Sequence, residues 1–363
     1  MIILKIIDLF VGAGGLSYGF EQSGFETILA IDKWPDAIKT YNFNRLNKVG
    51  TTRDIKSFND SDLSSLKKLN VSGIIGGPPC QGFSMVGTRD YYDPRNSLYL
   101  DFVNFVNKIS PEFFLIENVQ GLLSLEKGRV INDIYERFGN LGYNVNHRTM
   151  IASDYGVPQN RKRVFIIGLK TEIFGDIKFD FDSIAKEVSI STKDAISDLD
   201  PLTDKSFSET YFTAPQNHFQ TLMRQDLKTV ENHLRTEHTK QTIDIISLVP
   251  DGGRISDLPN DYYKIRNYNN AFRRMDSTKP SNTIDCGHRN YFHYKENRIP
   301  TVRESARIQS FPDHYVFLGS KTSQYTQVGN AVPPLLARKI ANQLKKYLNH
   351  EFILKGDENE KNI

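Results

Sequence analysis

The chain has 363 residues, of which 39% are hydrophobic, so it can bury a substantial core and is longer than most single domains. Its 46 Lys and Arg residues against 43 Asp and Glu give a net charge of +3, which is too small to identify a nucleic-acid partner by itself. With only two cysteines, Cys80 and Cys286, the chain carries no disulfide framework, which favours a reducing compartment.

The first half alternates short β-branched runs with amphipathic segments of helix length, the pattern of a parallel sheet with crossover helices. The first run has no positive leader and no cleavage site, so it predicts a strand rather than a signal peptide, and no run reaches the length of a membrane span. We therefore predict an α/β fold with a doubly wound, mostly parallel sheet. The predicted strands are 2–9, 27–31, 73–75, 113–116, 144–149 and 163–168, and the predicted helices of this half are 101–109 and 131–138.

A glycine-rich loop, DLFVGAGGLS at residues 8–17, follows the first predicted strand and opens a helix, which is the context of nucleotide binding. A dinucleotide fingerprint would place glycine where Ser17 stands, which argues against NAD. Asp32 closes the second strand, 20 residues after Gly12, where it can accept hydrogen bonds from ribose hydroxyls. Trp34 can lie against an adenine face or in the core, and Asp54 can accept from an adenine amino group or be a surface carboxylate.

The segment GGPPCQGFS, residues 76–84, places Cys80 just past a predicted buried strand. Two prolines fix the backbone and three glycines allow close approach of another molecule. A lone cysteine is usually an inert core residue. No core strand is built with this composition, so the segment predicts a nucleophile at the sheet edge where ligands bind.

The second half is less regular. Residues 175–260 are polar and contain one predicted helix at 239–249, and a last amphipathic helix follows Pro334. Residues 261–310 carry ten Lys and Arg against five acids, interleaved with aromatic residues. Such a segment is either an ordinary solvated surface or a nucleic-acid surface.

Six short sequence blocks occur in the order that is typical of the DNA (cytosine-5) methyltransferases, and the chain resembles that family. The resemblance covers nearly the whole length except residues 170–280, the variable target-recognition region of that family. It implies a sheet of the S-adenosylmethionine-dependent methyltransferase type. The blocks are DLFVGAGG at 8–15, GPPCQGFS at 77–84, ENV at 117–119, QNRKR at 159–163, RESARIQSFP at 303–312 and GNAVPP at 329–334.

The resemblance implies a catalytic role for four residues. Cys80 adds to carbon 6 of cytosine, and Glu117 contacts ring nitrogen 3 and the amino group, unless it merely caps a turn. Arg163 donates to the carbonyl oxygen at position 2 and orients Glu117, while Arg161 serves loop or phosphate contacts. No side chain is predicted as the base for the carbon 5 proton, so water is the default.

The cofactor implied is S-adenosylmethionine, and the target cytosine must leave the duplex to reach it. Cys286 is read as structural, and eight scattered histidines without ligand spacing predict no metal site. The predicted cofactor-binding residues are Phe10, Gly12, Gly14, Gly15, Leu16, Asp32, Trp34, Asp54, Ile55, Pro79, Asn330 and Val332. The predicted DNA-binding residues are Gln81, Ser84, Arg273, Arg274, Arg289 and Asn290.

The predicted organisation is a catalytic domain of residues 1–174 completed by residues 323–350, a target-recognition domain of residues 175–322, and a polar tail of residues 351–363. Two alternatives stay open: the tRNA-modifying branch of the same family, and a nucleotide-binding module or NAD-dependent oxidoreductase. The long basic insert argues against the first, and Ser17 against the second. We expect a monomeric cytoplasmic bacterial or phage enzyme that acts on double-stranded DNA without metal or membrane, with a separate restriction endonuclease as a candidate partner.

Overall fold

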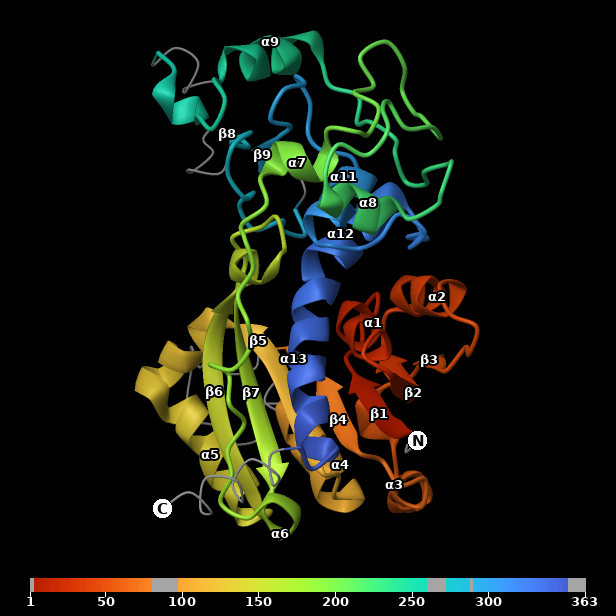
Figure 1. Cartoon of the computed structure of the whole chain (residues 1–363), viewed down its shortest axis with the longest axis vertical. Helices are drawn as coiled ribbons and strands as arrows, with labels where there is room; N and C mark the ends of the chain where they lie inside the picture. Colours follow the sequence, from red (N-terminus) through yellow and green to blue (C-terminus); the bar gives the residue numbers. More distant parts are fainter. Residues whose placement is uncertain (1–2, 80–96, 260–271, 288–289, 352–363) are drawn as a thin grey trace, which may run out of the picture.

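The computed structural model describes residues 3–79, 97–259, 272–287 and 290–351, and a seven-stranded sheet forms its base (Figure 1). The strand order is β3-β2-β1-β4-β5-β7-β6. Strands β1 to β5 are parallel to one another, whereas β7 is antiparallel to both β5 and β6. The strands are β1 (Leu4–Leu9), β2 (Phe25–Asp32), β3 (Gly50–Thr52), β4 (Gly73–Gly76), β5 (Phe113–Val119), β6 (Tyr143–Ile151) and β7 (Lys162–Lys170).

Helices cover both faces of this sheet, which explains why the central strands β1, β4, β5 and β7 are mostly apolar on both sides. Alternate residues of β5 enter different cores: Phe113 packs on the side of α1 and α13, and Phe114 on the side of α4 and α5. Phe114 stacks on Phe138 with a ring-centroid separation of 3.9 Å. The helices of this part are α1 (Gly15–Glu21), α2 (Pro35–Phe43), α3 (Asp60–Lys67), α4 (Ser97–Ile109), α5 (Arg129–Asn140), α6 (Thr171–Phe174) and the C-terminal α13 (Pro334–Leu348).

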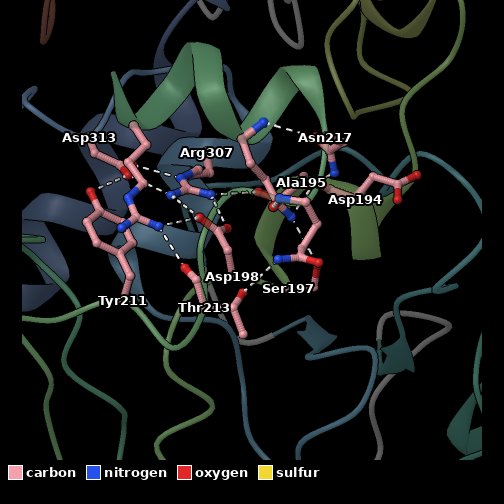
Figure 2. Close-up of polar contacts among 12 residues, drawn as sticks. Asp194, Ala195, Ser197, Asp198, Tyr211, Thr213, Asn217, Arg307 and Asp313 are labelled. Carbon is pink, nitrogen blue, oxygen red and sulfur yellow. Dashed lines mark hydrogen bonds and ion pairs between the residues drawn. The ribbon is translucent and has the colours of Figure 1, made fainter. Parts of the chain in front are cut away.

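A second group of elements lies beyond the sheet, at the top of Figure 1. Among the described residues its helices are short, and its two strands form a parallel pair of two residues each. A buried ion network ties it together: Arg307 lies between Asp198 and Asp313, at 2.6 Å from each, and Tyr211 donates to Asp313 (Figure 2). These elements are α7 (Thr192–Ile196), α8 (His218–Arg224), α9 (Lys240–Leu248), β8 (Arg273–Arg274), β9 (Tyr291–Phe292), α11 (Val302–Ile308) and α12 (Lys321–Asn330).

The predicted fold class is confirmed. All six predicted strands and all four predicted helices occur, with ends shifted by a few residues. The three-residue β3 and most of the short helices beyond residue 175 were not predicted. None of the helices in the described ranges is long and apolar enough to cross a membrane.

Candidate active site

A cavity of about 690 Å³ opens at the carboxyl ends of β1, β2, β4 and β5, the edge at which open α/β sheets bind ligands. Segments far apart in sequence line it. They are the glycine loop with the ends of β2, β4 and β5, Arg161 and Arg163 around the start of β7, and two segments of the second half, 283–286 and 327–332.

The glycine loop forms one end of the cavity. Gly12 has a φ of 55°, and a side chain there would enter open space. Its amide donates to Asp32 Oδ2 at 2.8 Å, and the amide of Trp34 donates to Asp32 Oδ1 at 2.9 Å, so one carboxylate fixes the loop to the end of β2. Gly15 lies so close to Val332 that a Cβ would come within 2.2 Å of its carbonyl oxygen. The predicted cofactor-binding residues that line the cavity are Phe10, Gly12, Gly15, Leu16, Asp32, Trp34, Ile55, Pro79, Asn330 and Val332.

Two predicted cofactor-binding residues are not among those that line the cavity. Gly14, with a φ of 82°, packs against the Tyr41 ring, which a Cβ would overlap. Asp54 pairs with Lys33 at 2.7 Å and accepts a hydrogen bond from the amide of Lys56. Gly14 therefore supports the loop on the side away from the cavity, and the carboxylate of Asp54 is engaged by Lys33 and by the amide of Lys56.

The other end of the cavity holds a carboxyl–guanidinium pair. Glu117, near the end of β5, is buried, and Arg163 Nε donates to its Oε1 at 2.9 Å across the β5–β7 pair. Burial raises the pKa of Glu117, which Arg163 and Arg161 oppose. The neighbouring Asn118 donates from Nδ2 to the carbonyl of Pro78 at 2.9 Å and so holds the segment that leads to Cys80. Cys80 itself, with Gln81 and Ser84, lies outside the described residues.

Arg161 is the most deeply buried cation of the cavity, 1% exposed. Its Nη1 donates to the carbonyl of Ile284 at 3.2 Å, and Nε finds no hydrogen-bond partner among the described residues. Burial, together with the charge of Arg163, lowers its pKa to about 9. The sequence pattern grouped Arg161 with Arg163, and the structure places both in the cavity wall.

Residues 283–286 form a wall that the sequence did not predict. Cys286 was interpreted as structural, but it is exposed and lines the cavity, where its Sγ donates to Asn330 Oδ1 at 2.7 Å. Although the residue as a whole is exposed, its thiol is partly buried against the cavity wall, and this partial burial raises its pKa. No local pattern marks this segment, because contacts with residues distant in the chain, 158–161 and 329–330, hold it at the cavity.

The structure describes three of the six predicted DNA contacts, Arg273, Arg274 and Asn290. Arg273 in β8 is half-buried, and Asn290 bonds to Asp285. The prediction that Arg274 contacts DNA needs correcting. Its side chain is 5% exposed and donates hydrogen bonds to the backbone carbonyls of Ile246, Val249, His293 and Glu296. A buried guanidinium with four backbone carbonyl partners stabilises the fold, so Arg274 is no longer proposed as a DNA contact. Arg289 lies outside the described residues.

Asp8, at the base of the glycine loop, was part of a predicted block but was given no role. It lines the cavity, is 1% exposed, and neither carboxyl oxygen has a hydrogen-bond partner among the described residues. Burial raises its pKa from 3.8 to about 7, against the opposing effects of Ser17 and Arg45. Within the described ranges, no group of three or more His, Cys, Asp or Glu residues is arranged to hold a metal ion.

This burial predicts a pH dependence of stability. Between pH 4 and 7 the folded protein keeps a proton on Asp8 that the unfolded chain has lost, so the free energy of unfolding falls as pH rises and levels off above 7. The free energy of unfolding lost over this pH range is at most about 4 kcal/mol, because one pKa unit corresponds to about 1.4 kcal/mol. Asp8→Asn has no carboxyl to titrate at this position and is expected not to show this loss. Urea unfolding of both proteins from pH 4 to 8 checks it, and an unchanged pH slope in the variant contradicts the assignment.

The chain is similar to known proteins in sequence and in fold. The sequence model described as C-5 cytosine-specific DNA methylase matches residues 4–346. The chain is 41% identical to the Type II methyltransferase M.DdeI of Desulfomicrobium norvegicum, over 96% of this chain and 90% of that protein. It is 38% identical to the Type II methyltransferase M1.HphI of Haemophilus parahaemolyticus, over 96% and 88%. Among solved structures, a DNA modification methyltransferase encoded within an E. coli prophage is 28% identical with a TM-score of 0.80, over 95% of this chain and 99% of that one.

Proposed function

Because the chain belongs to the C-5 cytosine-specific DNA methylases and is a DNA (cytosine-5-)-methyltransferase of the restriction–modification type, we propose a specific chemistry for its cavity. The enzyme transfers a methyl group from S-adenosylmethionine to carbon 5 of a cytosine flipped out of duplex DNA, through a covalent bond to Cys80. The observation that carries the proposal is that one cavity holds both the Asp32-anchored glycine loop and the Glu117–Arg163 pair.

The loop end fits the nucleoside and methionine parts of the cofactor, which supplies an electrophilic methyl group when bound. Phe10, Leu16 and Ile55 give an apolar lining, and Gly12 leaves open space above the backbone. Asp32 accepts two backbone hydrogen bonds, and a carboxylate has further lone pairs for ribose hydroxyls.

The other end fits a cytosine ring. Carbon 5 is a poor nucleophile until a thiolate adds at carbon 6, which moves charge toward nitrogen 3. Glu117, whose pKa burial raises, can carry a proton to that edge, and Arg163 can donate to the oxygen at position 2. After carbon 5 has taken the methyl group, its proton leaves to water and the bond to Cys80 breaks.

Asp32→Ala tests the cofactor end. A hydrogen bond to a charged group contributes roughly 1.5–3 kcal/mol, so the Kd for S-adenosylmethionine is expected to rise about 10- to 150-fold. Isothermal titration calorimetry measures it, with Asp60→Ala, at the start of α3, as a control that keeps the wild-type value. Wild-type affinity in Asp32→Ala excludes this role.

We also propose the division of the chain into a catalytic part, residues 1–174 with 323–350, a recognition part, residues 175–322, and a tail, residues 351–363. The recognition part surrounds the Arg307 network, and residues 280–284 run beside 158–161 of the catalytic part. A monomer in the bacterial cytoplasm acting on double-stranded DNA, with a separate cognate endonuclease, is consistent with this organisation.

A segment exchange tests where specificity resides. Residues 176–279 are replaced by the matching segment of a relative with another DNA target; the exchange ends before the cavity wall at 283–286. Bisulfite sequencing of plasmid DNA from expressing cells is expected to show methylated cytosines at the donor's sequence. An active chimera that still methylates the original sequence contradicts the division. Methylation confined to tRNA would instead support the tRNA-modifying alternative.

A further inference from the structure

Two fully buried glutamines lie beneath the wall of the cavity. Gln159 and Gln309 are both 0% exposed, and Gln159 Nε2 donates to Gln309 Oε1 at 2.7 Å. They are 150 residues apart in the chain. Neither lines the cavity, yet each is bonded to backbone that does.

Gln159 is bonded to the wall that faces the proposed base site. Its Oε1 accepts from the amide of Ile284 at 2.9 Å, while the carbonyl of Ile284 accepts from Arg161. Backbone bonds between residues 158–160 and 281 run beside this contact: Asn160 donates to the carbonyl of Ser281, and Ser281 to that of Pro158. The position of Ile284 therefore sets the position of Arg161 and of the segment that ends in Cys286.

Gln309 is bonded to the wall at the cofactor end. Its Nε2 donates to the carbonyls of Val328 at 2.8 Å and Ala331 at 3.2 Å. Ala331 and its neighbours Asn330 and Val332 line the cavity. On the cavity side of the same wall, Cys286 bonds to Asn330.

The polarity of this chain of bonds is fixed at both ends. A backbone N–H begins it at Ile284, and backbone carbonyls end it at Val328 and Ala331, so each amide side chain can be oriented in one way only. Each glutamine must accept on one side and donate on the other. A buried group left without its partner is costly, so the relay admits one arrangement of the two walls.

We propose that Gln159 and Gln309 are a positioning pair that holds the base end of the cavity in register with the cofactor end. This rests on the proposed function, because it assumes that the base is bound near Arg161 and the methyl donor near Val332. Methyl transfer requires the two reacting carbons at close approach, and a misplacement of about 1 Å costs on the order of a hundredfold in rate. Neither side chain touches the reacting atoms, so the pair acts through the walls.

The test separates positioning from stability. Gln159→Leu and Gln309→Leu are expected to lower the single-turnover rate of methyl transfer roughly tenfold to a hundredfold, with the KM for DNA and the Kd for the cofactor within about threefold of wild type. Gln220→Leu is the matched control. Gln220 is also fully buried, and its side chain makes hydrogen bonds with Asp194, Ser197 and Gln216 away from the cavity, so its loss lowers the melting temperature but leaves the rate unchanged.

Gln309→Glu provides an independent test of the positioning role, through the pH dependence of the rate. Its carboxyl still accepts from Gln159, and while protonated it can also donate to Ala331. Burial favours the protonated form, so the rate of this variant relative to wild type is expected to fall as pH rises through the raised pKa of the new carboxyl. The rate of Gln309→Leu relative to wild type is expected to show no such fall with pH, because leucine does not titrate.

Wild-type rates in the two leucine variants, or an equal loss in Gln220→Leu, overturn the proposal. So does a Gln309→Glu to wild-type ratio that does not change with pH. Failure of the proposed function gives a different result, because the wild-type enzyme and Gln220→Leu would then also transfer no methyl group to DNA.

Discussion

Cys80→Ala is expected to methylate no DNA and to form no adduct with a duplex that carries 5-fluorocytosine at the target position. The thiolate is the only group proposed to raise the electron density at carbon 5, so its removal takes away the reaction path rather than slowing one step. In the wild-type enzyme, fluorine at carbon 5 cannot leave as a proton, and the bond between Cys80 and carbon 6 persists. A band shift on a denaturing gel measures the adduct.

The second cysteine provides the control for this experiment. Cys286 also lines the cavity, but burial raises the pKa of its thiol, which keeps it in the weakly nucleophilic neutral form. Cys286→Ala is therefore expected to trap the fluorinated duplex. An adduct that forms in Cys80→Ala and disappears in Cys286→Ala would transfer the nucleophilic role to the second thiol.

Glu117→Gln is expected to lower kcat by about 100- to 10,000-fold, the range attributed to general acid–base catalysis, while the Kd for S-adenosylmethionine stays near wild type. The amide keeps the shape of the side chain but cannot deliver a proton to nitrogen 3, and it exchanges the ion pair with Arg163 for a hydrogen bond from Arg163 to a neutral acceptor. Single-turnover methyl transfer with both substrates saturating measures the loss.

The pH profile gives the same assignment a second check. The protonated carboxyl is the donor, and burial raises its pKa, so the wild-type rate is expected to fall as pH rises through that value. The rate of Glu117→Gln is expected not to show this fall with pH, because the amide does not titrate. Glu112→Gln, a half-buried carboxyl just before the other end of β5, is the control and keeps the wild-type profile. A wild-type rate in Glu117→Gln would mean that the ring is activated without this acid.

Local signals made much of the fold predictable. The β-branched runs and the glycine loop are contiguous in sequence, and their periodicity reports burial directly, so β1, β4 and β5 were found with the loop that follows β1. The three-residue β3 is too short to show a period. The antiparallel insertion of β7 between β5 and β6 depends on pairing between distant segments, which leaves no pattern in either strand.

In the site, too, residues within local motifs could be predicted, whereas residues placed by distant contacts could not. Glu117 and Arg163 lie in short motifs and meet at 2.9 Å, as predicted. Charge in a sequence does not report burial, so Arg274 appeared as a candidate DNA contact although its donors hold backbone carbonyls inside the fold. The cavity wall at 283–286 and the Gln159–Gln309 contact arise from partners far away in the chain, and no local pattern announces either.

The last helix has a consequence for how the protein folds during synthesis. One face of the sheet is covered by α1 together with α13, and α1 approaches so closely that a Cβ on Gly19 would meet Ala337 within 2.5 Å. Residues 334–348 leave the ribosome more than 300 residues after the first strands, so the apolar face that these strands form stays uncovered until then. Contacts of such sequence separation form slowly, and the waiting surface is open to association with other nascent chains. We expect the growing chain to depend on chaperones until α13 docks.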